Sequence, residues 1–223
     1  KNKADLKATN VKINESSLEF TIDGETYRSD SNYQYQIYNL LACWGVFKEL
    51  KLDPKIFKET ISTFPEVKGR REKVDNELRL NTIIDFAHTP NALLATLRSL
   101  RQITSGRLIT IFGATGGRDK SKRPLMGKIV SENADIAIIT ADDTRNEKVE
   151  DINSQIISGI DLKKAVEIDP TNPKIINPSL FHFANVPNRQ DAFNLAVKMA
   201  KPGDTIVACG KGHESTILHG HTE

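Results

Sequence analysis

The chain has 223 residues, of which 38% are hydrophobic and 27% are charged, the balance of an ordinary globular protein. A formal net charge of +2 argues against a general binder of nucleic acids or other polyanions. The sequence contains neither an apolar run that could span a bilayer nor a signal-peptide core. We therefore expect a cytoplasmic monomer without nucleic-acid or membrane partners, built as one large domain or two small ones.

The N-terminal part changes from an alternating to a helical pattern. Residues 5–29 form short alternating runs, and the Asp23-Gly24 pair predicts a hairpin turn. From Tyr35, apolar residues recur at helical spacing up to Leu50, which predicts one amphipathic helix. A second short helix is expected from Pro54 to about Phe64. By pattern alone, this part is typical of the end of a domain.

Strands and helices then alternate. The predicted strands are Asn81–Phe86, Leu108–Phe112, Ile136–Thr140, Phe181–Ala184 and Thr205–Cys209. The predicted helices are Asn91–Ile103, a segment from Pro124, Val149–Ile160 and Asn188–Met199. The Pro- and Asn-rich stretch 161–180 is expected to be mostly loop. Such βα repeats predict an α/β fold, a Rossmann-like and mostly parallel sheet with helices on both faces. Two cysteines, Cys43 and Cys209, are expected to be reduced core residues.

Four of these strands end in loops rich in glycine and charge. They are DFAHTP (85–90), GATGGRDKSKR (113–123), DDTR (142–145) and GKGHE (210–214). Because the carboxyl ends of parallel strands lie on one edge of a sheet, we expect these loops to line one rim. The rim carries both signs of charge, which suits a ligand that has both ammonium and carboxylate groups.

Each loop also has a plainer interpretation. His88 could cap the helix that starts near Pro90, Asp142 and Asp143 could cap the following helix, and the charges at 118–123 could be solvated. Two phosphate-binding motifs are incomplete. A Walker A loop needs Gly-Lys-Ser/Thr separated by four residues from its first glycine, but Arg118-Asp119 stands there after Gly113. The Rossmann fingerprint lacks its last glycine, although Asp142 follows as a possible acidic partner.

DFAHTP, FGATGGRDKSKRPLMGKI, TADDTRNE and PGDTIVACGKGHE, in this order, resemble the C-terminal domain of the Mur ligases. With YQIYNLLA and VKGRREKV upstream, the resemblance covers nearly all of residues 33–214. It is strongest to the UDP-N-acetylmuramoyl-tripeptide synthetase branch. It implies that residues 1–68 end an α/β central ATP-binding domain and that residues 69–223 form the C-terminal domain.

The resemblance implies an ATP- and Mg²⁺-dependent ligase that adds a diamino acid to UDP-MurNAc-L-Ala-D-Glu through an acyl phosphate. The residues implied to contact ATP are Asn39, Arg70, Asp85 and His88. Those implied to hold the incoming amino acid are Arg118, Asp142, Asp143, Arg145, Gly210, Lys211 and Glu214. Positioning and charge stabilisation are implied, with no nucleophile and no metal ligand in this chain.

The chain departs from the family pattern in several places. Asp142-Asp143-Thr144-Arg145 stands where the family has Asp-Asn-Pro-Arg, Gln36 replaces an Asn, and Lys68 replaces a Pro. Arg145 favours meso-diaminopimelate over L-lysine, because the extra carboxylate needs a cation, whereas Asp143 weakens that preference.

The upstream phosphate loop, the Mg²⁺ carboxylates and the UDP-binding domain are missing from this sequence. We therefore expect the C-terminal portion of a three-domain ligase, inactive alone. Alternatives are a non-catalytic amino-acid- or nucleotide-binding fragment, a folylpolyglutamate- or cyanophycin-type ligase, and, less favoured, an NAD(P)-binding Rossmann protein.

Overall fold

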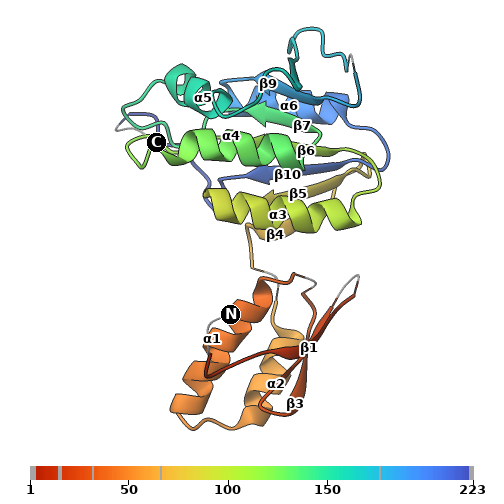
Figure 1. The fold of residues 1–223 in the computed structure, drawn as a ribbon, viewed down its shortest axis with the longest axis vertical. Coiled ribbons are helices and arrows are strands. Elements are labelled where there is room, and N and C mark those ends of the chain that lie inside the picture. Colours follow the sequence, from red (N-terminus) through yellow and green to blue (C-terminus); the bar gives the residue numbers. More distant parts are fainter. Residues whose placement is uncertain (1–3, 15–16, 32, 66, 176, 221–223) are drawn as a thin grey trace. The chain divides into compact units, whose positions relative to one another are not determined.

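The computed structural model describes residues 4–14, 17–31, 33–65, 67–175 and 177–220. The chain folds into two compact units, residues 1–66 and residues 67–223, drawn in red to orange and in yellow to blue in Figure 1. Each unit has a hydrophobic core of its own. In the described part of the chain, no helix is both long enough and apolar enough to cross a bilayer.

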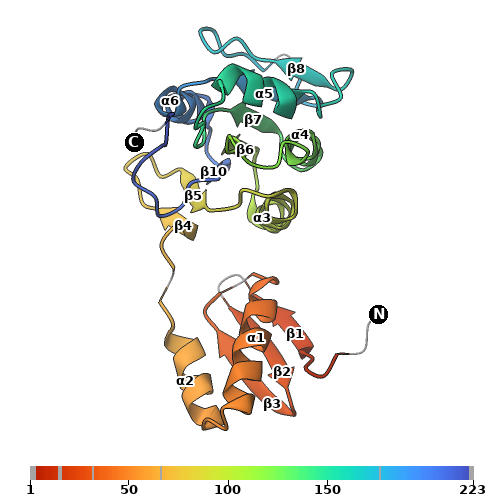
Figure 2. The same cartoon turned by 90° about the vertical axis from the view of Figure 1, so that its left-hand side faces the viewer.

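In the N-terminal unit, an antiparallel sheet packs against two helices (Figure 2). The sheet has the order β1-β2-β3, with β1 at Thr9–Ile13, β2 at Leu18–Ile22 and β3 at Glu25–Ser29. The helices are α1 at Gln36–Glu49 and α2 at Pro54–Thr63. The predicted hairpin turn is confirmed, because Asp23 and Gly24 join β2 to β3 with φ of 49° and 87°, the left-handed values that a tight hairpin needs.

Three aromatic side chains pack together within the core of this unit. The ring centroids of Tyr27 and Trp44 lie 5.4 Å apart, and the ring of Phe57 lies 5.4 Å from Tyr27 and 5.1 Å from Trp44. Two expectations about burial were wrong here. Leu50 is 64% exposed because α1 ends at Glu49. Cys43 is exposed because it lies outside the face of α1 that buries Ile37, Leu40 and Trp44.

The C-terminal unit contains a sheet of order β4-β5-β10-β6-β7-β9-β8. The strands are β4 Arg70–Val74, β5 Asn81–Asp85, β6 Leu108–Phe112, β7 Ile136–Ile139, β8 Ala165–Glu167, β9 Phe181–Asn185 and β10 Thr205–Cys209. The helices are α3 Pro90–Ile103, α4 Lys122–Asn133, α5 Val149–Ile157 and α6 Arg189–Met199. Every strand pair is parallel except β4 with β5.

Helices cover both faces of this sheet, as Figure 2 shows. The helices α3, α4 and α5 bury their apolar faces in one core layer, and α6 buries its apolar face in the other. The predicted α/β fold, with a mostly parallel sheet between helices, is therefore confirmed. Asn188 also caps α6 as predicted, because its side chain accepts a hydrogen bond from the Asp191 N–H at 3.1 Å.

Two strands were missed by the sequence analysis. The strand β4 reads Arg-Arg-Glu-Lys-Val, and it lies at the sheet edge, where no apolar alternation is needed. The strand β8 has only three residues and lies inside the stretch expected to be loop. The helix α4 begins at Lys122, two residues before Pro124, and Leu125 on it is 53% exposed.

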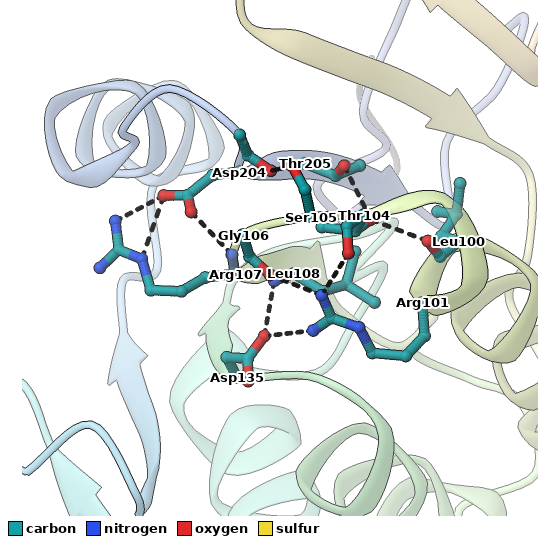
Figure 3. A network of polar contacts seen from close by, with 11 residues as sticks. Leu100, Arg101, Thr104, Ser105, Gly106, Arg107, Leu108, Asp135, Asp204 and Thr205 are labelled. Atoms are coloured by element: carbon teal, nitrogen blue, oxygen red, sulfur yellow. Dashed lines mark hydrogen bonds and ion pairs between the residues drawn. The ribbon is translucent and has the colours of Figure 1, made fainter.

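At the amino edge of the sheet, two arginines fix the starts of neighbouring strands (Figure 3). Arg107 donates from Nε to Oδ2 of Asp204 at 3.0 Å, and its backbone N–H donates to Oδ1 at 2.7 Å. Arg101 donates from Nη1 to Oδ2 of Asp135 at 2.6 Å, and the same oxygen accepts the Leu108 N–H at 2.7 Å. This network holds the starts of β6, β7 and β10 together.

Candidate functional site

The four polar loops follow four neighbouring strands. The strands β5, β10, β6 and β7 are adjacent in the sheet, and their ends are in register, with Cys209 opposite Asp85 and Phe112 opposite Ile139. The loops therefore lie side by side along the carboxyl edge, where open α/β sheets bind ligands. We call this edge the rim.

The loops after β6 and β7 touch each other backbone to backbone. The Gly116 N–H donates to the Asp143 carbonyl at 2.7 Å. A Cβ on Gly116 would overlap the Thr144 carbonyl oxygen, and one on Gly113 would overlap the Thr140 carbonyl oxygen. These glycines are needed because the two loops approach too closely for any side chain.

Glu147 joins the same two loops through its side chain. Its carboxylate accepts from both Nη atoms of Arg123, at 2.9 and 3.0 Å, and from the Gly117 N–H at 2.7 Å. Lys120 adds an ion pair at 3.0 Å. The Arg123 hydrogen bonds, followed by the Gly117 amide and Lys120, hold the pKa of Glu147 well below its ordinary value.

Neither Glu147 nor Arg123 was predicted as a site residue from the sequence. The Arg123 side chain is fully buried, so the charge run 118–123 is not simply a solvated loop. A local signal was available for Arg123, because helical spacing puts it on the same face of α4 as Met126 and Val130. For Glu147 no local pattern indicates its partners.

The loops after β7 and β10 are joined by an ion pair between Asp143 and Lys211. Burial raises the pKa of the Asp143 carboxyl, but the Leu218 N–H at 2.9 Å and Lys211 outweigh burial, so the pKa lies below its usual value. The neighbouring Asp142 is buried, and a Cβ on Gly210 would lie 2.7 Å from its Oδ2. Gly210 also has a φ of +98°, so both its conformation and its surroundings favour glycine.

Arg145 is held by a segment near the C-terminus. Its N–H donates to the Leu218 carbonyl at 3.1 Å, and its carbonyl accepts the Gly220 N–H at 2.7 Å. Thr144 Oγ1 lies 3.0 Å from Nδ1 of His219. We call residues 218–220 the strap, and the sequence analysis did not identify it.

The side chain of Arg145 packs against the loop after β6. A Cβ on Gly117 would lie 3.5 Å from its Cδ. Its Nε is buried and has no hydrogen-bond partner among the described residues. A buried N–H without an acceptor is costly, and a bound carboxylate would satisfy it.

Three of the residues predicted to contact ATP lie at the rim, and they differ in whether their side chains are already held by hydrogen bonds. Arg70 is exposed, and its guanidinium lies 4.2 Å from the centroid of the Phe86 ring, while His88 Nδ1 lies 3.0 Å from the Phe86 carbonyl. Asp85 is buried, and both its oxygens accept hydrogen bonds, from the Ala87 N–H at 2.9 Å and Thr96 Oγ1 at 3.2 Å. Burial raises the pKa of Asp85, although these hydrogen bonds oppose the shift.

The capping alternatives were wrong. Thr89, rather than His88, caps α3, since its Oγ1 accepts the Ala92 N–H at 3.3 Å. Asp142 and Asp143 do not cap α5, because that helix begins at Val149 and its N-cap is Lys148.

Other predicted site residues are not joined by contacts. Asn39 lies in the N-terminal unit, exposed on α1, and donates to Gln36 at 3.0 Å. Glu214 turns back to accept the Gly212 N–H at 2.8 Å. Arg118 is exposed, and its side chain makes no hydrogen bond or ion pair within the described residues. The assignment of these residues to one ligand site stays a prediction.

Two further cations at the rim were also missed. Arg189 donates to the Ala141 and Cys209 carbonyls, both at 3.0 Å, and so joins the ends of β7 and β10. Burial lowers the pKa of this guanidinium, while Asp142 opposes the shift. Lys122 Nζ donates to the His88 carbonyl at 3.2 Å, and burial lowers the pKa of its ammonium.

Two hollows of this unit lie at the edge opposite the rim. One is lined by residues that include Lys128, Lys164 and Phe181, the other by residues that include Arg79 and Asp204. The predicted site residues of this unit and the buried Arg145 Nε without a partner among the described residues lie at the rim, so we place the site there. In the described part of the chain, no group of three or more His, Cys, Asp or Glu side chains could hold a metal ion.

Residues 69–212 match the family described as Mur ligase, glutamate ligase domain. The chain is 39% identical to UDP-N-acetylmuramoyl-L-alanyl-D-glutamate–2,6-diaminopimelate ligase of Lawsonia intracellularis, over 80% of this chain and 33% of that protein. It is 35% identical to the first such ligase of Clostridium acetobutylicum, over 98% of this chain and 43% of that protein. The chain thus spans only about a third to two fifths of these curated relatives.

Solved structures show the same fold. A 2,6-diaminopimelate ligase covers 98% of this chain, which covers 42% of that one, with a TM-score of 0.57 and 24% identity. A pseudomurein peptide ligase type C from Methanothermus fervidus covers 94% of this chain, which covers 40% of that one, with a TM-score of 0.67 and 23% identity. The family match extends over well over half of the chain. This chain therefore belongs to the Mur ligases, and its C-terminal unit carries their glutamate ligase domain.

Proposed function

We propose that this chain is the C-terminal portion of an ATP-dependent ligase of peptidoglycan synthesis, cytoplasmic and monomeric. The ligase adds meso-diaminopimelate, in preference to L-lysine, to UDP-MurNAc-L-Ala-D-Glu. The similarity to 2,6-diaminopimelate ligases supports the reaction class and the substrate. The single observation that carries the proposal is Arg145 at the rim, which has a fixed backbone and a buried Nε without a partner among the described residues.

The rim offers the charges that a diamino acid needs. The guanidinium of Arg145 would hold a carboxylate, and the exposed Arg118 would add a second cation. Asp143 and Glu214 would attract ammonium, while Lys211 limits the charge of Asp143 by pairing with it. Buried Asp142 and Gly210 would set the shape of the loop ends. The amine, once deprotonated, attacks the activated D-glutamyl carboxyl carbon and expels phosphate, and these residues position it.

ATP would supply the phosphoryl group that activates the D-glutamyl carboxylate. Arg70 fits a nucleotide, because its guanidinium stacks on Phe86 and makes no hydrogen bond with the described residues. Asp85 fits a supporting role, because both its oxygens are already used. His88 would face the nucleotide beside Arg70. Asn39 is the residue of the domain 1–68 that the family resemblance implies for ATP. We place the Mg²⁺ ligands upstream of this chain.

The test is phosphate release by the full-length ligase, measured with meso-diaminopimelate and with L-lysine. We expect release with diaminopimelate and little with lysine. Arg145→Ala is expected to raise the KM for diaminopimelate on the order of 10- to 100-fold, whereas Arg98→Ala, an exposed change on α3, should leave it unchanged. Equal use of lysine, or an unchanged KM in Arg145→Ala, would contradict the assignment.

A non-catalytic amino-acid- or nucleotide-binding module, or a folylpolyglutamate- or cyanophycin-type ligase, remains the second candidate, and absence of diaminopimelate-dependent release would favour it. The NAD(P) alternative has weaker physical support. Gly113 and Gly116 of GATGG are used to pack against carbonyls of the neighbouring loop. These glycines therefore have a structural reason that requires no dinucleotide, and titration with NAD(P) should show no binding.

A further inference from the structure

Glu147 lies where the loops after β6 and β7 meet. The groups that donate to its carboxylate, within the described residues, all come from the segment 117–123. Oε1 accepts from Gly117 N–H at 2.7 Å and from Arg123 at 3.0 Å. Oε2 accepts from Arg123 at 2.9 Å and pairs with Lys120 at 3.0 Å. The Glu147 carboxylate thus holds the turn at Gly117, the basic stretch at Lys120 and the start of α4 at Arg123.

Arg123 has little alternative to this partner. Its side chain is fully buried, and its other acceptors are neutral, the Gln155 Oε1 at 2.8 Å and the Thr115 carbonyl at 3.3 Å. Without Glu147, a buried guanidinium would lack a counter-charge, which is strongly unfavourable. The Arg123–Glu147 pair is therefore a rigid support for anything attached to it.

The turn attached to this support lies beside the side chain of Arg145. Gly117 adopts a φ of +62°, and the Arg145 side chain lies where a Cβ on Gly117 would make van der Waals contact. The same carboxylate pairs with Lys120 at 3.0 Å, while Arg118 makes no ion pair with the described residues. The contacts of Glu147 therefore hold the Gly117 turn in place along one side of the Arg145 side chain.

We propose that Glu147, with Arg123, is a positioning residue for the amino-acid substrate, which fixes the Gly117 turn so that Arg145 and Arg118 keep a binding geometry. This inference rests on the proposed ligase function. Glu147 itself has its oxygens occupied, so it acts through these neighbours rather than on the substrate.

The first experiment uses Glu147→Gln in the full-length ligase, with Glu150→Gln as the matched control, since Glu150 is exposed at the start of α5. We expect the KM for meso-diaminopimelate to rise on the order of 10-fold, with the KM for ATP within about twofold. Glu150→Gln should leave both constants unchanged. An equal rise in both KM values would indicate a merely structural role and would overturn the proposal.

A double-variant cycle with Arg145→Ala sharpens the test. If Glu147 acts in part by holding Arg145, the loss of diaminopimelate affinity in the double variant should be smaller than the sum of the two single losses. Additive losses would overturn the proposal. If Glu147→Gln does not fold, Glu147→Asp can replace it, because it keeps the charge. This variant should show a smaller rise in the KM for diaminopimelate, again with little change in the KM for ATP.

Amide hydrogen exchange of the full-length protein separates this inference from the proposed function. In Glu147→Gln, the segment 113–121 should exchange at least several-fold faster, while strand β6 keeps its wild-type rate. This readout needs no activity, so an inactive wild-type enzyme would refute the ligase proposal without touching the positioning of the turn. Unchanged exchange of 113–121 would refute the positioning role.

Discussion

Gly69 and Gly212 lie in backbone contact. A Cβ on Gly69 would overlap the backbone of Gly212 and His213, and a Cβ on Gly212 would lie 2.7 Å from the Gly69 carbonyl oxygen. Gly69 precedes β4, and Gly212 lies in the loop after β10 that carries Lys211. The segment that enters the C-terminal unit is therefore fixed directly to a loop of the rim.

The first prediction concerns this contact. Gly69→Ala should destabilise the C-terminal unit by roughly 2–4 kcal/mol, because overlap with backbone adds to the strain of a left-handed residue. The φ of Gly69 is +70°. Denaturant unfolding followed by circular dichroism measures the change.

The control is Gly24→Ala in the N-terminal unit. Gly24 has a φ of +87° and nothing within 4 Å of its Cβ position, so the substitution reports strain alone, about 1 kcal/mol. An equal decrease in the free energy of unfolding for both variants would mean that the Gly69–Gly212 contact does not add to the cost of the substitution.

The second prediction concerns acid stability and the network in Figure 3. Burial raises the pKa of Asp204, but hydrogen bonds from Arg107 and from the Lys201 N–H outweigh it, so its folded-state pKa lies below the ordinary value. A carboxyl with a depressed pKa stabilises the fold above its unfolded pKa, and this stability is lost as the pH falls through the folded pKa.

Asp204→Asn should therefore cost stability at pH 7 and should flatten the acid limb of the stability curve. Breaking one side of a buried ion pair costs about 3–5 kcal/mol, and the side chain of Asp204 is only 4% exposed. Asp161→Asn is the control, because the Asp161 side chain is 55% exposed. Urea unfolding between pH 3 and pH 7 checks this prediction, and parallel curves for the wild type and Asp204→Asn would contradict it.

The sequence predicted the buried strands well and the site only in part. The strands β6 and β10 occupy their expected ranges because both are fully buried runs bounded by turns. The common edge of the four rim loops followed from the parallel direction of their strands, which βα repetition indicates. Glu147 and the strap could not be predicted, because their partners lie 24 to 75 residues away and depend on how two loops pack.

The third prediction concerns the aromatic support of Arg70. Phe86→Ala should raise the KM for ATP about 2- to 5-fold, since a cation–π contact at an exposed site is worth about 0.5–1 kcal/mol. The KM for diaminopimelate should not change, because Arg70 belongs to the nucleotide group. Steady-state kinetics of the full-length ligase measure both constants, and Phe193→Ala, beside Arg189 on α6, is the comparison. A change confined to diaminopimelate would reverse the assignment.

The fourth prediction concerns the strap. The Leu218 N–H donates to Asp143 Oδ1, the same oxygen that pairs with Lys211. Leu218→Pro removes this donor, and the loss of a hydrogen bond to a charged group costs about 1.5–3 kcal/mol locally. Asp143 should then lose its fixed orientation, and the KM for diaminopimelate should rise several-fold, while the KM for ATP stays within error.

The matched control for the strap is Leu218→Ala, which keeps the N–H and removes most of the side chain. If backbone donation matters, only the proline variant should weaken diaminopimelate binding. If the apolar side chain matters instead, the two variants should be equally impaired, and the role given to the strap would be wrong. Both variants should keep the far-UV circular dichroism of the folded wild type, because the strap lies outside the sheet and its cores, and this result would place the effect in the site rather than in the fold.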